Sequence, residues 1–130
     1  MLLDLFNSKM KEHLFSYGTL QQQAVQLKLF DRTMTGTKDV LMGYTIQRIK
    51  ISDPAFLASG ENNIQHTLMA TFNESDKING IILELTKKEL SLVDQYEPSN
   101  YIRHKVVLAS GKEAWVYIAD LDATKPPEPL

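Results

Sequence analysis

Apolar and polar residues follow one another along this chain in patterns that predict strands separated by short helices. Residues 14–17 form an apolar and aromatic run, which is typical of a strand. Leu20, Ala24 and Leu27 then recur at helical spacing and predict a short helix over residues 21–30. The first two elements are therefore expected to be a strand and a helix with a very short connection.

Strand patterns dominate the middle of the chain. Residues 40–51 are rich in β-branched and aromatic side chains and predict a strand, in which Gly43 is expected to form a bulge or bend. Further strands are expected over residues 67–72 and 81–85, and loops at Asp53-Pro54 and over residues 59–65.

A second helix is marked at its start by local chemistry. Thr86 and Glu89 have the spacing of a capping box, in which the hydroxyl and the carboxylate each satisfy a backbone N–H group. Leu85 and Leu90 occupy the positions of a hydrophobic staple around that cap. Pro98 is expected to end the helix at the residue before it.

The last strands predict a hairpin. Residues 101–108 alternate like a strand, Ser110 and Gly111 form a turn, and residues 113–119 return along the first strand.

Length and composition indicate one globular domain. A chain of 130 residues can bury a single core, and 43% hydrophobic with 23% charged residues is ordinary for a folded protein. We expect the domain at residues 13–121, between an amphipathic extension at residues 1–12 and a flexible proline-rich tail at residues 122–130. The extension either covers the core of the same chain or mediates a homodimer, and the pattern leaves both open.

The net charge and the absence of cysteine argue against several kinds of partner and site. A formal net charge of −2 gives no general attraction to nucleic acid or to an anionic membrane. The absence of cysteine excludes a disulfide and a thiolate metal site, and it suits a cytoplasmic protein. The apolar runs are too short to cross a bilayer, and residues 1–6 lack the pattern of a secretory signal.

The first candidate site is the end of the first strand at Gly18. A strand that turns sharply through glycine leaves backbone N–H groups pointing at one place, where a carboxylate or an oxyanion can bind. The same pattern also marks an ordinary strand that ends at a glycine. The pattern alone leaves both interpretations open.

The second candidate lies on the helix after Thr86. Leu90, Val93, Asp94 and Glu97 share one helical face, so the two carboxylates are directed toward the core or the edge of a cavity. The negative end of the helix dipole and partial burial would raise a carboxyl pKa there and suit it to proton transfer. The alternative is that both acids reach solvent or pair with basic residues of the next strand.

Other patterns give weaker hypotheses. The three histidines are far apart and have no spacing of metal ligands, so no metal site is expected. Ser16 and Thr19 lie outside any nucleophile motif, and Gly18 lacks the companion glycines of a phosphate loop. Basic and aromatic residues alternate over residues 101–105 and 115–117, which is compatible with an RNA-binding sheet but more typical of core or edge packing.

Four segments in register resemble the γ-glutamylcyclotransferase family, which includes the AIG2-like proteins. Tyr17-Gly18-Thr19-Leu20 resembles the signature loop of that family. The segment at residues 92–103 resembles its second motif, in which a glutamate precedes a tyrosine and an arginine. The other two are the glycine-led strand at residues 78–85 and the closing strand at residues 115–117. The order and spacing match from residue 13 to residue 119.

The resemblance implies a fold, a site and a reaction. The fold is α+β, a small barrel-like mixed β-sheet flanked by short helices, with a cavity between the signature loop and Glu97. In the family, the α-amine of a γ-glutamyl group attacks its own γ-carbonyl, which gives 5-oxoproline and releases an amine. Glu97 matches the catalytic glutamate, the backbone amides of Gly18, Thr19 and Leu20 match the substrate-holding loop, and Tyr17 helps to shape the pocket.

The implied chemistry needs little besides these groups. Closure of a five-membered ring is intramolecular, so neither a nucleophilic side chain nor a cofactor is required. One carboxylate can serve first as base and then as acid, while backbone donors stabilise the oxyanion.

Two assignments and one alternative function stay open. Arg103 either binds the carboxylate of the substrate or pairs with Asp94 or Glu97, and Asp94 is expected to be structural. The leaving amine is undefined, because Asp53 to Phe56 and the polar run after the signature loop depart from the family pattern. The alternative to an enzyme is a binding module that senses a small carboxylated metabolite in the same pocket.

Overall fold

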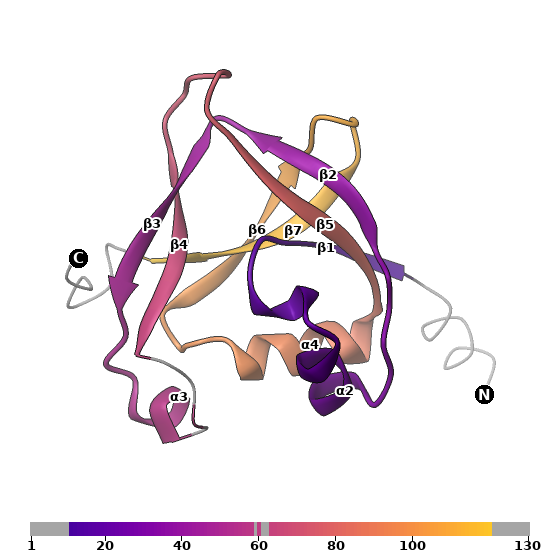
Figure 1. Ribbon diagram of the computed structural model, residues 1–130, viewed down its shortest axis with the longest axis vertical. Coiled ribbons are helices and arrows are strands. Elements are labelled where there is room, and N and C mark those ends of the chain that lie inside the picture. The colour runs from indigo at the N-terminus through magenta and orange to yellow at the C-terminus, as the bar shows by residue number, and fades with distance from the viewer. Residues whose placement is uncertain (1–10, 59, 61–62, 121–130) are drawn as a thin grey trace.

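The computed structural model describes residues 11–58, 60 and 63–120 of the chain (Figure 1). The predictions for most of residues 1–12, for part of the loop at residues 59–65 and for the tail at residues 122–130 therefore lie outside the described residues. Lys11 and Glu12, which we assigned to the extension, are the first residues of a strand.

Short strands and helices alternate along the chain. In order they are β1 (Lys11–Ser16), η1 (Thr19–Gln21), α2 (Gln23–Phe30), β2 (Thr37–Met42), β3 (Tyr44–Lys50), α3 (Pro54–Ala58), β4 (Ile64–Ala70), β5 (Lys77–Thr86), α4 (Lys87–Tyr96), β6 (Tyr101–Val107) and β7 (Glu113–Ala119). Within the described residues, no helix is long and apolar enough to cross a membrane.

The strands form two sheets that curve around a common interior. One sheet has five strands in the order β2-β5-β1-β7-β6, and the other is the β3–β4 pair. β1 and β7 pair in parallel at Leu14 and Trp115, and the other pairs are antiparallel. Side chains join the two sheets, since the N–H of Ala119 donates to Thr67 Oγ1 at 2.7 Å. The result is the expected α+β fold with a small barrel-like sheet and few short helices.

Both faces of the central strand β1 are buried. Leu14 packs with Leu83, Leu90 and Val93 in a cluster that α2 and α4 cover from outside (Figure 1). Phe15 faces the other way, into the apolar interior of the barrel. Because both faces of β1 are covered, its last residues are buried one after another. The turn that follows β1 therefore starts at one edge of the core.

Two glycines fix the backbone around the barrel. The predicted bend at Gly43 is confirmed. This residue lies between β2 and β3 with a φ of +86°, a left-handed conformation that glycine adopts easily, and the chain continues there into the second sheet. Gly80 of β5 lies against β1, where an added Cβ would come within 2.5 Å of the Ser16 carbonyl oxygen. A side chain at position 80 would therefore push away the strand that leads into the signature loop.

The predictions for α4 and for the last hairpin are confirmed. Thr86 and Glu89 form the capping box, with the Glu89 N–H donating to Thr86 Oγ1 at 3.1 Å and the Thr86 N–H donating to Glu89 Oε1 at 2.9 Å. Glu97 is the C-terminal cap of this helix. β6 and β7 pair in the expected hairpin, with Arg103 opposite Tyr117.

Two predictions about local structure are wrong. Asp53-Pro54 is not only a loop, since α3 begins at Pro54 and the Asp53 carboxylate accepts the N–H of Ala55 at 3.2 Å. Proline is favourable in the first turn of a helix, where its missing N–H costs nothing. The predicted loop at residues 59–65 extends too far, because β4 begins at Ile64. In α2, Leu27 is 52% exposed and Gln26 is fully buried.

Candidate active site

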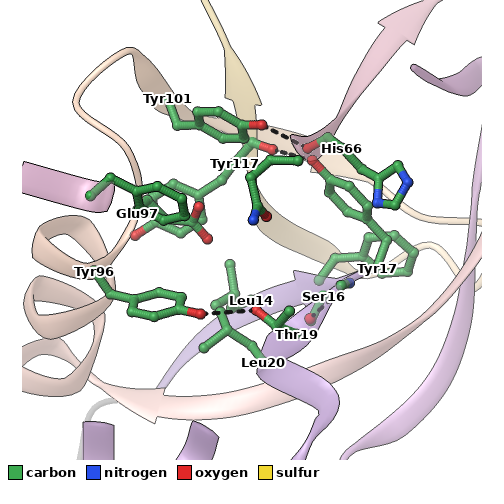
Figure 2. A pocket seen from close by; sticks show the side chains of 14 residues that line it. Leu14, Ser16, Tyr17, Thr19, Leu20, His66, Tyr96, Glu97, Tyr101 and Tyr117 are labelled. Atoms are coloured by element: carbon green, nitrogen blue, oxygen red, sulfur yellow. Dashed lines mark hydrogen bonds between the residues drawn. The ribbon is translucent and has the colours of Figure 1, made fainter. Parts of the chain in front are cut away.

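A cavity of about 80 Å³ lies where the end of β1 meets the C-terminal end of α4 (Figure 2). The connection between β1 and η1 supplies one wall, and α4, β6 and β7 supply the opposite one. The side chains and backbone that line the cavity belong to Leu14, Phe15, Ser16, Tyr17, Gly18, Thr19, Leu20, Phe56, Gln65, His66, Tyr96, Glu97, Tyr101 and Tyr117. The structure thus brings Glu97 and all four residues of the signature loop to one place.

The signature loop lines this cavity and has two backbone N–H groups without a backbone partner among the described residues. The N–H groups of Gln21 and Gln22 turn back to the carbonyl oxygens of Gly18 and Thr19, at 3.2 and 2.9 Å. Within the described part of the chain, the N–H groups of Thr19 and Leu20 form no such bond, as is usual for the first residues of a helical turn. These two donors are available to a bound carboxylate or an oxyanion.

Gly18 keeps the approach to these donors open. A Cβ built at this position would meet no heavy atom within 4 Å, so the space beside the backbone is empty. Its φ of −138° is not left-handed, so the conformation itself does not demand glycine. A glycine at this position leaves the backbone of the loop accessible at the edge of the cavity that it lines.

A buried glutamine holds the loop in place. Gln26 of α2 donates from Nε2 to the Leu20 carbonyl oxygen at 2.9 Å and accepts the Met34 N–H on Oε1 at 2.8 Å. Both polar ends of a fully buried side chain are thus satisfied. Gln26 was not singled out from the sequence, where Leu20, Ala24 and Leu27 set the helical repeat of this segment.

Glu97 reaches the cavity from the end of α4. Its backbone N–H closes the helix on the Val93 carbonyl oxygen at 2.9 Å, and its side chain is half-buried. The preceding residue, Tyr96, spans the cavity, where its hydroxyl lies 3.1 Å from Thr19 Oγ1 (Figure 2). This bond ties the signature loop to the helix that carries Glu97.

Four of the five tyrosines of the chain line the cavity. Burial raises the pKa of Tyr17, and the nearby Tyr101 and the negative charge of Glu97 raise it further. The pKa of Tyr101 is raised by burial first and then by Glu97. The pKa of Tyr117 is also raised, first by burial and then by its hydrogen bond to Asp94 and the negative charge of that residue. The phenols therefore stay protonated at neutral pH and surround the carboxylate with weakly polar walls.

The tyrosine hydroxyls also fix the walls in position. Tyr17 donates to the backbone carbonyl of Tyr117 at 2.8 Å, which joins β1 to β7 across the site. Tyr101 donates to the His66 carbonyl oxygen at 2.8 Å and so connects β6 to β4. The first bond adds a side-chain contact between neighbouring strands, and the second joins the two sheets.

Asp94 and Arg103 lie outside the cavity, although they are close to it. Arg103 donates to both carboxylate oxygens of Asp94, from Nε at 2.8 Å and from an Nη at 3.1 Å. Tyr117 donates its hydroxyl to the same carboxylate. The guanidinium also lies 4.6 Å from the centre of the Trp115 ring. Arg103 does not line the cavity, and we assign it to the structural pair with Asp94 that the sequence left open.

Several lining residues carry no local sequence signal. Phe56 comes from α3, and Gln65 and His66 come from β4, far along the chain from the signature loop. They meet the loop only because the β3–β4 pair closes the barrel. Among the described residues, no group of three or more histidines, aspartates or glutamates is placed to hold a metal ion.

Known proteins share both the sequence pattern and the fold. Residues 14–129 match the family described as "Gamma-glutamyl cyclotransferase, AIG2-like". No curated protein sequence matches the chain significantly.

Solved structures resemble this fold at low sequence identity. A structure titled "Gamma-glutamyl cyclotransferase" has a TM-score of 0.67 and 14% identity, over 92% of this chain and 70% of that one. A protein from Arabidopsis thaliana has a TM-score of 0.64 and 22% identity, over 89% of this chain and 73% of that one. An uncharacterized protein from Homo sapiens has a TM-score of 0.63 and 18% identity, over 92% of this chain and 69% of that one.

Proposed function

This chain belongs to the gamma-glutamyl cyclotransferase, AIG2-like family, and we propose that it cyclises a γ-glutamyl amine or peptide to 5-oxoproline and releases the amine. Family membership and fold support an enzyme of the cyclotransferase type. The observation that supports the specific reaction is that Glu97 and the Tyr17 to Leu20 loop line the same cavity.

The proposed reaction removes two protons from the attacking nitrogen and supplies two to the nitrogen that leaves. The Glu97 carboxylate takes a proton from the α-ammonium of the γ-glutamyl group, and the freed nitrogen lone pair attacks the γ-carbonyl carbon. The carbonyl oxygen becomes an oxyanion and accepts hydrogen bonds from the N–H groups of Thr19 and Leu20. Glu97 then gives its proton to the departing nitrogen as the carbon–nitrogen bond breaks. The ring nitrogen loses its second excess proton to the released amine, which leaves as an ammonium, and the lactam ring of 5-oxoproline remains.

The surroundings of Glu97 suit this role. Tyr17, Tyr101 and Tyr117 line the cavity beside the carboxylate without adding a second negative charge, since their phenols stay protonated. Because both reacting groups belong to one substrate, ring closure needs neither a cofactor nor a nucleophilic side chain. The protein has to hold the substrate folded, move the proton and stabilise the oxyanion.

The substitution Glu97→Gln tests the proposal. It keeps the shape of the side chain and removes its basicity, so we expect 5-oxoproline formation to fall about a hundredfold or more. Exposed Glu113 on β7 offers a matched control, since Glu113→Gln makes the same chemical change away from the cavity and should keep full activity. Circular dichroism and a thermal melt establish that both variants fold.

A panel of γ-glutamyl compounds distinguishes an enzyme from the alternative, a binding module for a small carboxylated metabolite. Incubation with γ-glutamyl peptides and γ-glutamyl amines, followed by detection of 5-oxoproline, should give product with at least one of them. Unchanged turnover in Glu97→Gln would remove the proposed role of this residue. If no compound is converted but one of them stabilises the protein against heat, the binding module for a carboxylated metabolite becomes the better assignment.

A further inference from the structure

The γ-glutamyl group carries an α-carboxylate that has no partner in the proposed reaction. Glu97 takes a proton from the α-ammonium, and the N–H groups of Thr19 and Leu20 hold the oxyanion. The α-carboxylate and the α-nitrogen are bonded to the same carbon, so the carboxylate enters the cavity of about 80 Å³ close to Glu97. A carboxylate that leaves water needs hydrogen-bond donors in place of it. A further donor is therefore required in the cavity.

The tyrosines of the cavity already use most of their hydroxyl hydrogens within the protein. Tyr17 and Tyr101 donate to backbone carbonyl oxygens, and Tyr117 donates to a carboxylate. The hydroxyl of Tyr96 shares a hydrogen bond with that of Thr19 at 3.1 Å. Because a hydroxyl has a single hydrogen to donate, Tyr17, Tyr101 and Tyr117 cannot serve the α-carboxylate while they keep these bonds.

Side chains with N–H groups reach the cavity from β4. Among the described residues that line it, Gln65 and His66 have such side chains, and none is a lysine or an arginine. Successive residues of a strand point to opposite faces. His66 is exposed, and its ring points away from Glu97 (Figure 2). The face of β4 that carries Gln65 is therefore the one to consider.

The neighbours of Gln65 identify its face as the inner one. Gln65 lies directly opposite Ile49 of β3, which is 1% exposed and packs with Phe56, another residue that lines the cavity. Thr67 follows two residues later on the same face. It is fully buried, and its Oγ1 accepts the Ala119 N–H at 2.7 Å. The half-buried amide of Gln65 thus lies on the side of β4 that closes the cavity.

We propose, on the basis of the proposed function, that Gln65 binds the α-carboxylate of the γ-glutamyl group and so makes the site select substrates that carry it. The amide donates from Nε2 to a carboxylate oxygen, and its Oε1 is an acceptor for a hydrogen of the adjacent α-ammonium. A neutral amide also suits a place near the base. A lysine or arginine there would stabilise the charged form of Glu97 and weaken it as a base, whereas glutamine adds no charge.

Two lactams test the contact, because 5-oxoproline and 2-pyrrolidinone share a ring and differ only in the carboxylate. Gln65→Met nearly keeps the length of the side chain and removes its amide. We expect the variant to bind 5-oxoproline at least about tenfold more weakly than the wild-type protein, since a hydrogen bond to a charged group is lost. Its Kd for 2-pyrrolidinone should stay the same. Titrations followed by nuclear magnetic resonance measure the four Kd values.

Turnover gives a second readout that a merely structural role would not reproduce. The α-carboxylate is bound alike in the substrate and in the transition state, so Gln65→Met should raise KM for a γ-glutamyl amine about tenfold and change kcat less. A variant that only displaced Glu97 would lower kcat instead. Gln23→Met makes the same chemical change at the exposed start of α2 and should keep the wild-type KM and Kd. A thermal melt establishes that both variants fold.

The outcomes separate this inference from the function on which it rests. The inference is wrong if Gln65→Met binds 5-oxoproline as tightly as the wild-type protein or loses both lactams equally. It is also wrong if the wild-type protein does not prefer 5-oxoproline to 2-pyrrolidinone, or if His66→Gln loses that preference while Gln65→Met keeps it. If no γ-glutamyl compound gives 5-oxoproline, the proposed reaction is wrong, whereas the two lactams still test the contact of Gln65 with a carboxylate.

Discussion

A substitution at Gly18 is expected to affect the proposed reaction but not the stability of the fold. Its φ is negative and an added Cβ would touch nothing, so Gly18→Ala should change the free energy of unfolding by less than about 1 kcal/mol. Gly18 nevertheless lines the cavity of about 80 Å³, and the methyl group would stand next to the N–H groups that are proposed to hold the oxyanion. We expect the variant to fold normally and to form 5-oxoproline at least about tenfold more slowly.

Two measurements on one sample check this expectation. Urea unfolding gives the stability of Gly18→Ala, and the release of 5-oxoproline gives its activity. A stable variant with full activity would show that the substrate does not approach the backbone at Gly18.

Asp94 and Glu97 show how far a helical repeat predicts the position of a side chain. The repeat places both acids on the face of Leu90 and Val93, and Glu97 does line the cavity. The Asp94 side chain is instead 37% exposed and bonded to Arg103. Its partners come from β6 and β7, whose place beside α4 follows from the order of the strands and not from the sequence of the helix.

At the scale of elements, α2 holds the signature loop through Gln26, a buried polar side chain that the sequence did not single out. Gln26→Leu keeps the volume of that side chain but leaves the Leu20 carbonyl and the Met34 N–H without their partner. We expect a loss of about 2 kcal/mol in the free energy of unfolding, since buried polar groups without partners are costly. We also expect a higher KM, because the loop that holds the γ-glutamyl group is no longer fixed.

The control for this change lies on the same helix. Gln23 is exposed at the start of α2, so Gln23→Leu should alter the unfolding free energy by no more than about 0.5 kcal/mol. Guanidinium unfolding of both variants gives the comparison. Equal stabilities would mean that the Gln26 bonds do not hold the loop.

Elements with local signals were predicted well, and those that depend on distant contacts were not. α4 and the β6–β7 hairpin follow from a capping box, a proline and a glycine turn that lie within the elements themselves. α3 was missed because Asp53-Pro54 also reads as a turn. What favours the helix is the Asp53 carboxylate, which caps it at Ala55 and also accepts the N–H of Ser99, 46 residues away.

At the scale of the whole molecule, the cavity is a product of strand order. The resemblance of four short motifs predicted the barrel-like α+β fold and the meeting of Glu97 with the signature loop. The sequence did not predict that His66 would close the cavity, because β4 reaches it only through the second sheet. Contacts such as that of Tyr101 with the His66 carbonyl depend on this closure and have no counterpart in any local pattern.

The buried tyrosines couple the site to the stability of the whole chain. Tyr17, Tyr101 and Tyr117 have raised pKa values, with burial as the largest cause for each and the charge of Glu97 as a further one. In the unfolded chain their pKa returns to an ordinary value of about 10. Above that pH the unfolded chain loses protons that the folded chain keeps, so ionisation favours unfolding.

We therefore expect the free energy of unfolding to be independent of these tyrosines up to about pH 9 and to fall steadily above about pH 10. Guanidinium unfolding at a series of alkaline pH values measures this fall, and tyrosinate absorbance should rise together with the loss of structure. In Glu97→Gln the fall should start at the same pH, because the unfolded chain sets the onset. The fall should end at a lower pH, since the carboxylate no longer raises the folded-state pKa values. If most of the tyrosinate signal instead appears near pH 10 while the chain stays folded, the phenols are open to water and the cavity does not enclose Glu97.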